Sequence, residues 1–293
     1  MWLKLENKIG FFKKVWYSIT NIKKYDEMTK QGLFSAIKYA MLLLAMLGII
    51  MAGFETFEQI KAVNKSISYL EQNLPEFTIN KQEINLQNED TVILESEEME
   101  KFFGCNIVIA QNLEENEAIE QYANMVKGEY SCLVFLKNEY VLITPKYSQD
   151  GGENGILKGE YSNEVSKYLG DSKEEYNKED VMNYLKENIS YTYYFVIDFV
   201  IYFLTLIILY VFFLFVVALS YILALKMTKI KTPVKQAISE VLYAETLSMI
   251  VYVMYILLSY ILKFKFSFIY GINLLIVYIY MMIVIRGKKN AKE

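Results

Sequence analysis

The chain of 293 residues is 54% hydrophobic and 22% charged, which is too apolar for an ordinary soluble domain and too charged for a chain lying wholly in lipid. Its net charge of −4 conceals a segregation, because residues 56–190 carry 26 acidic and 12 basic side chains, a net −14, and the remainder must carry +10. There is no histidine, which excludes Ser-His-Asp and Cys-His nucleophilic sites, histidine proton relays and histidine-ligated metal sites.

The amino-terminal segment, residues 1–32, holds seven lysines against three acidic residues. Ile9, Phe12, Trp16 and Ile19 recur within it at helical spacing, with lysines around them. This pattern predicts a short amphipathic helix that lies on the anionic inner leaflet of a membrane. A simple basic tail that only sets the topology explains the same lysines.

Four apolar stretches are long enough to cross a bilayer, and they occupy residues 33–55, 191–225, 241–262 and 266–285. The first is interrupted only by Lys38, and about 22 helical residues within it cover roughly 33 Å. A cleaved signal peptide is the competing interpretation of this stretch, but no clear small-residue cleavage site follows it. Thr232 and Pro233, in the loop and helix start at residues 226–240, predict the start of the third helix.

The basic residues of the short loops predict the orientation. Lysine and arginine are concentrated in residues 1–32, in the loop at 226–240 and in the tail at 286–293, whereas the short loop assigned to the outside has Lys263 and Lys265. Because basic loops stay in the cytoplasm, both termini are expected there, and an even number of spans agrees with this.

Residues 56–190 are therefore expected outside, and their first part, residues 57–72, continues the first helix outward. Strands are expected at residues 77–80, 91–94, 106–110, 131–136 and 140–144, helices at 117–127 and 174–190, and a glycine-rich loop at 150–155. The predicted fold is a membrane α-helical protein with four transmembrane helices, one before and three after an inserted, acidic extracytoplasmic α+β domain.

Polar side chains share one face of each of the last three spans. They are Tyr194, Asp198, Tyr202 and Thr205 on the second span, Glu245, Ser248, Tyr252, Tyr255 and Ser259 on the third, and Tyr270, Asn273 and Tyr280 on the fourth. Polar groups that face lipid are costly, so these faces should point toward one another. The seam that they form is either a groove for a ligand or lipid headgroup, or a set of hydrogen bonds between helices.

Charged residues within the spans suggest an ion pair. Lys38 and Glu245 both lie about two turns from the cytoplasmic ends of their helices, and Glu240 lies at shallower depth. We expect Lys38 to pair with Glu245 or Glu240. The alternative is that all three side chains extend to the membrane interfaces.

The two cysteines, Cys105 and Cys132, fall in two of the expected strands. An outer domain lies in a compartment that permits disulfides, so the two residues form a cross-link if they are adjacent in space. Otherwise they are two buried thiols.

Carboxylates cluster at residues 95–100 and 114–117, but neither cluster has the spacing of a calcium loop, so a solvated face is the simpler interpretation. No metal-ligand spacing, phosphate loop or dinucleotide fingerprint occurs, and no metal or cofactor is expected. Nucleic-acid binding is not expected either, because the basic residues flank the spans.

Three segments resemble an uncharacterised membrane family of Gram-positive bacteria. They are SITNIKKYDEMTKQGLFSAIKYA at residues 18–40, LPEFTINKQEI at 74–84 and TPVKQAISEVLYAET at 232–246. The family is a domain of unknown function and includes a membrane protein encoded with maltodextrin-utilisation genes. The resemblance covers nearly the full length and implies an accessory protein of the cell envelope, linked to transport, in the bacterial plasma membrane.

We therefore expect a non-enzymatic accessory or sensory protein whose outer domain binds a ligand or an envelope protein partner. The alternative is a subunit of a membrane transporter with a polar path near Glu245 and Asp198, which would need to oligomerise or join a partner. A membrane enzyme is a third hypothesis, limited to carboxylate, tyrosine or lysine chemistry.

Overall fold

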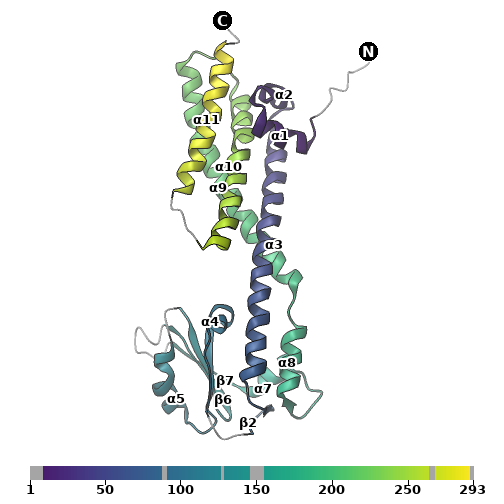
Figure 1. Cartoon of the computed structure of the whole chain (residues 1–293), viewed down its shortest axis with the longest axis vertical. Coiled ribbons are helices and arrows are strands. Elements are labelled where there is room, and N and C mark those ends of the chain that lie inside the picture. The colour runs from purple at the N-terminus through teal and green to yellow at the C-terminus, as the bar shows by residue number, and fades with distance from the viewer. Residues whose placement is uncertain (1–8, 88–90, 127–128, 146–154, 264–267, 291–293) are drawn as a thin grey trace. The chain divides into compact units, whose positions relative to one another are not determined.

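The computed structural model describes residues 9–87, 91–126, 129–145, 155–263 and 268–290, and it divides into two compact units (Figure 1). The helical unit comprises Met1–Thr56 and Thr192–Glu293, and the sheet unit comprises Phe57–Tyr191. The glycine-rich loop expected at residues 150–155 lies, apart from its last residue, outside the described residues.

Within the described part of the chain, four helices are long and apolar enough to cross a membrane, and a region containing strands lies between the first and the second of them. They are α3 (Leu33–Asn73), α9 (Tyr191–Met227), α10 (Val234–Leu262) and α11 (Ile269–Asn290). The expected first span and its outward continuation form one uninterrupted helix of 41 residues, α3, which is about 60 Å long. This helix contributes residues to both units.

The helix α10 begins one residue after the expected start signal. Pro233 has an extended backbone and occupies the cap position, and the helix continues from Val234. It ends at Lys263, whose left-handed backbone (φ of 51°) breaks the helical repeat. Of the four long helices, α10 has the largest buried share, 56% of its most apolar window against 22% for α9, so it lies at the centre of the helical unit.

The amino-terminal segment folds into three short helices, α1 (Phe11–Thr20), η1 (Ile22–Lys24) and α2 (Tyr25–Thr29). One face of α1 is buried at Lys14 and Ser18, and the Tyr25 hydroxyl donates to the Ser18 carbonyl oxygen at 2.8 Å. The opposite face exposes Phe12 and Trp16, by 75% and 65%. A helix is therefore present in the expected segment, and one of its faces is anchored to the helical unit.

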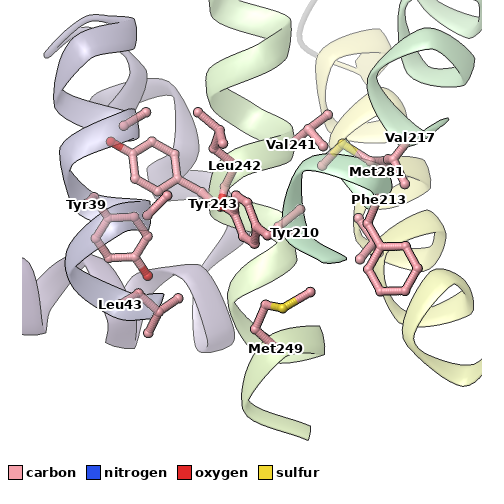
Figure 2. Close-up of a cluster of buried hydrophobic side chains, with 14 of the residues drawn as sticks. Tyr39, Leu43, Tyr210, Phe213, Val217, Val241, Leu242, Tyr243, Met249 and Met281 are labelled. Carbon is pink, nitrogen blue, oxygen red and sulfur yellow. The ribbon is translucent and has the colours of Figure 1, made fainter. Parts of the chain in front are cut away.

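The core of the helical unit joins these elements (Figure 2). Tyr39 from α3 lies with its ring centroid 5.2 Å from that of Tyr243 of α10. The Tyr210 hydroxyl of α9 donates to the Leu242 carbonyl oxygen at 2.7 Å. A carbonyl within a helix already accepts its own helical bond, so this second bond fixes α9 against α10 without breaking either helix.

The sheet unit contains a five-stranded and a three-stranded sheet. The five-stranded sheet has the order β3 (Val92–Leu94), β4 (Cys105–Ile109), β5 (Ser131–Phe135), β6 (Glu139–Ile143) and β7 (Ile156–Glu160), in which only β4 and β5 are parallel. The three-stranded sheet has the order β2 (Ile84–Leu86), β1 (Phe77–Ile79) and β8 (Tyr176–Asn177), all antiparallel. Among its described residues, the helices are α4 (Glu97–Phe103), α5 (Glu115–Tyr122) with η2 (Ala123–Met125), α7 (Tyr161–Tyr168) and α8 (Lys178–Glu187).

Candidate functional site

A tyrosine-rich groove of about 560 Å³ lies among the four long helices of the helical unit. It is lined by Met51 of α3, Tyr202, Thr205 and Leu206 of α9, Tyr252, Tyr255, Ile256, Ser259 and Tyr260 of α10, and Ile269 and Tyr270 of α11. Six of these residues belong to the three polar faces that the sequence predicts, so the structure brings these parts of the faces together. We call this feature the tyrosine groove.

The tyrosine groove has a buried apolar floor and a partly exposed rim. Leu206, Tyr252 and Ile269 are 1%, 7% and 7% exposed, whereas the rim residues Tyr260 and Tyr270 are 49% and 50% exposed. The rings of Tyr252 and Tyr270 contact each other, with centroids 5.9 Å apart. An apolar floor with a few polar groups on its walls is typical of small-molecule sites.

Three hydroxyl groups of the groove walls donate their protons to other parts of the helical unit. Tyr202 donates to a carboxylate oxygen of Glu55 at 3.0 Å, and Thr205 donates to the carbonyl oxygen one turn earlier in α9 at 2.8 Å. Ser259 donates to the carbonyl oxygen of Ile256 at 2.7 Å. Because the hydroxyls of Thr205 and Ser259 donate their protons to backbone carbonyls, their oxygens keep lone pairs for a neighbouring group.

A second part of the seam lies deeper in the helices and has no hydrogen-bond partner among the described residues. Glu245 and Ser248 of α10 and Asn273 of α11 are each fully buried, and their side-chain oxygens and nitrogens are unpaired. Glu245 and Ser248 share a helical face because they are three residues apart. Since α10 and α11 are antiparallel and Tyr252 contacts Tyr270, one turn along each helix brings Ser248 level with Asn273.

The expected ion pair between Lys38 and Glu245 or Glu240 is wrong. Glu240 is fully buried and accepts from Lys288 of α11, whose Nζ lies 2.6 and 2.8 Å from its two oxygens. Tyr221 and Gln236 also donate to Glu240. Lys38 is exposed, and its Nζ lies 4.6 Å from the Phe34 ring centroid. Glu245 does not pair with Lys38 either.

A protein-family model matches nearly the whole chain. The model of a protein family of unknown function, DUF1189, matches residues 12–285. The chain belongs to the DUF1189 family. No curated protein and no solved structure matches it.

Asp198 of this DUF1189 protein is buried, but it does not line the tyrosine groove. Its carboxylate accepts a hydrogen bond from the Thr56 hydroxyl at 2.9 Å, which joins α9 to α3. Asp198 and the Tyr202–Glu55 bond lie one turn apart on α9, so both connect the same two helices. The sequence pattern found Asp198 but could not indicate its partner, because threonine is common in apolar helices.

Cys105 and Cys132 of the DUF1189 chain are free, buried thiols. In the parallel pair of β4 and β5, Cys105 lies opposite Ser131 and Asn106 lies opposite Cys132. Successive residues of a strand point to opposite faces, so the two thiols lie on different faces of the sheet and no disulfide forms. Burial raises the pKa of the Cys132 thiol to about 12 and also raises that of Cys105.

Both carboxylate clusters of the sheet unit contain the start of a helix. Ser96 caps α4 by accepting from the Met99 amide, and Glu97 begins that helix. Glu115 and Glu117 occupy the first turn of α5, where the helix dipole favours negative charge. Within the described residues, no group of three or more Asp, Glu or Cys side chains is arranged to hold a metal ion.

Proposed function

We propose that this DUF1189 protein is a non-enzymatic accessory or sensory protein of the bacterial plasma membrane. The sheet unit lies outside the cell and binds a ligand or an envelope protein, and both chain termini lie in the cytoplasm. The concentration of lysine in residues 1–32 and 226–240 supports this orientation, because basic loops stay in the cytoplasm.

The observation that carries the proposal is the continuity of α3. This single helix supplies core residues to both units, with Tyr39 and Leu43 buried in the helical unit and Val63, Ile67 and Leu70 buried in the sheet unit. Packed interiors resist small displacements, so a shift of α3 caused by binding to the sheet unit strains the packing of the helical unit. A binding event outside thereby reaches the membrane.

The bonds between α3 and α9 lie where such a shift would act. Glu55 and Thr56 of α3 bond with Tyr202 and Asp198 of α9, and both bonds belong to the helical unit. A rotation or translation of α3 changes both bonds together. We propose that this pair of bonds transmits the response to α9.

The experiment first identifies the partner and then breaks the helix. A photoreactive residue at Leu157, which is 59% exposed on β7, should capture an envelope protein in cells. The resemblance to a family that includes a maltodextrin-associated protein favours a sugar-transport component as this partner. With that partner, hydrogen exchange of α10 amides should change in the parent and in Phe57→Ala. It should not change in Phe57→Pro, because proline interrupts the helix.

Phe57 suits this comparison because its side chain is 64% exposed, so alanine removes little packing. Equal responses of Phe57→Ala and Phe57→Pro would remove the proposed role of α3. Turnover of an envelope substrate by the purified protein, lost on a single carboxylate substitution, would show that the protein is an enzyme instead.

A second candidate function is a subunit of a membrane transporter. The observation that favours it is the unpaired, buried set of Glu245, Ser248 and Asn273, since intramembrane polar groups commonly mark substrate or ion pathways. Flux through proteoliposomes that contain the protein with its captured partner, lost in Glu245→Gln, would favour the transporter. Unchanged flux in that variant would exclude this path.

The exposed face of α1 supports one further partner, the anionic inner leaflet. Phe12 and Trp16 project from the helical unit, and Lys13, Lys23 and Lys24 lie close to them in sequence. Aromatic residues beside lysines are typical of helices that lie in the membrane interface. We propose that α1 contacts lipid on this face while its other face packs on α10.

A further inference from the structure

We infer that the tyrosine groove binds the ammonium group of an amphipathic molecule. This inference concerns the helical unit alone and does not depend on what the sheet unit binds. It follows from the shape of the groove, from the hydrogen-bonding state of its walls and from the charges around it.

The shape fits a molecule with an apolar body and a small polar end. A volume of about 560 Å³ lies in the range of sites for small ligands. Met51, Leu206, Ile256 and Ile269 provide apolar surface, and a partly exposed rim gives access from outside the groove.

The walls of the groove attract positive charge. Five tyrosine rings line it, and the face of an aromatic ring carries a negative partial charge that attracts cations. These rings belong to Tyr202, Tyr252, Tyr255, Tyr260 and Tyr270. The hydroxyls of Thr205 and Ser259 add oxygens whose protons are already donated to backbone carbonyls.

The lining of the groove also favours a cation over an anion. None of the eleven described residues that line it is basic, and Lys263, which follows α10, is not among them. The carboxylate of Glu55 accepts a hydrogen bond from the hydroxyl of the lining residue Tyr202 at 3.0 Å. A phosphate or carboxylate ligand would find no described basic side chain in the groove, whereas an ammonium group finds rings, oxygen lone pairs and a nearby carboxylate.

Two probes of the same shape and opposite charge test the inference. Tetraphenylphosphonium is an apolar cation and tetraphenylborate an apolar anion, so their difference in affinity reports charge preference. We expect the purified full-length protein in neutral detergent to bind the cation at least about tenfold more tightly in equilibrium dialysis. Equal or tighter binding of the anion would overturn the inference.

Three variants locate the binding. Tyr255→Leu removes one ring face and should lower the affinity for tetraphenylphosphonium by about 2- to 30-fold. Glu55→Gln keeps the size of the side chain and removes its charge, and it should also weaken binding. Tyr193→Leu is the matched control, because Tyr193 is 64% exposed on α9 and does not line the groove. Unchanged binding in both Tyr255→Leu and Glu55→Gln would place the cation elsewhere and overturn the inference.

Competition distinguishes the two sources of an ammonium group. Displacement of the probe in nanodiscs with phosphatidylethanolamine, but not with phosphatidylglycerol alone, identifies a lipid headgroup as the ligand. Displacement only by added hexadecyltrimethylammonium identifies a free amphiphile. If neither competitor displaces the probe, the groove does not recognise ammonium groups and the inference fails.

Discussion

Glu240 is a carboxylate that the structure removes completely from solvent and surrounds with donors. Lys288, Tyr221 and Gln236 all donate to it. Removing one partner of a buried ion pair leaves an uncompensated charge, which is more costly than removing both. The ion pair between Glu240 and Lys288 therefore stabilises the packing of α10 against α11. Lys288 lies in the segment at 286–293 that the sequence predicts to be a cytoplasmic tail.

We predict that Lys288→Met lowers the free energy of unfolding by about 3–5 kcal/mol, because Glu240 is left buried without its counter-charge. The double variant Glu240→Gln with Lys288→Met should recover part of this loss. The measurement is denaturant unfolding of the purified protein in detergent. Lys38→Met is the control, and since Lys38 is exposed, its change should stay within about 0.5 kcal/mol. A loss in Lys38→Met as large as in Lys288→Met would restore the pairing expected from sequence.

The buried thiols give a prediction about reactivity. With its pKa raised to about 12, Cys132 at pH 8 has a thiolate fraction of about one in ten thousand, so native protein should resist maleimide. Its labelling rate should rise about tenfold per pH unit between pH 8 and 10, whereas an unfolded thiol levels off above its pKa of about 8.5. Mass spectrometry of Cys105→Ser, with and without denaturant, measures this. Rapid labelling of native protein at pH 8 would contradict it.

The same pKa shift fixes the sign of the stability change. A raised thiol pKa in the folded state means that the unfolded state loses its proton first. The contribution of Cys132 to stability is therefore complete below about pH 8.5 and is lost as the pH rises toward about 12.

At the scale of helices, α1 gives the sharpest test of membrane contact. In a Trp2→Phe background Trp16 is the remaining tryptophan, and it is 65% exposed beside Phe12. If this face lies in the interface, brominated phosphatidylglycerol should quench Trp16 fluorescence in reconstituted protein. A tryptophan placed at Tyr25, which is 1% exposed, in a Trp2→Phe and Trp16→Phe background should be protected. Quenching of Trp16 by aqueous iodide instead would show a solvated helix.

A strand can be predicted from sequence when its own residues carry the strand pattern, and not when its pairing with a neighbour stabilises it. The strands β1, β3, β4, β5 and β6 have apolar or β-branched runs bounded by turn residues, and each of them coincides with an expected run. The strand β7, in contrast, has only two apolar residues and lies at the sheet edge, where its pairing with β6 supplies the structure. At Gly159 of β7, any side chain would collide with the ring of Tyr140 on β6. The need for glycine at this position comes from Tyr140 on the neighbouring strand, so the sequence of β7 alone gives little indication of a strand.

The residues of the candidate site could likewise be predicted only in part. Helical periodicity was sufficient to bring Tyr202, Tyr252 and Tyr255 into one groove, because a shared face is a local property of each helix. It could not indicate Met51, which looks like any apolar residue of a span. The Lys38 pairing was wrong because depth in the membrane does not determine the direction in which a side chain points around its helix. Lys38 is exposed, whereas the next residue, Tyr39, is buried.

At the scale of the whole molecule, the proposed orientation can be tested by labelling single cysteines from each side of the membrane. Because Cys105 and Cys132 are buried, a single added cysteine at an exposed position provides a clean label in the native protein. Leu157, on β7 of the sheet unit, and Met227, at the end of α9 beside the basic loop, are 59% and 84% exposed. A membrane-impermeant maleimide should label Leu157→Cys in intact cells and Met227→Cys only after permeabilisation, since basic loops are retained in the cytoplasm. Labelling of Met227→Cys in intact cells, with Leu157→Cys protected until permeabilisation, would reverse the orientation and with it the proposal that the sheet unit binds an external partner.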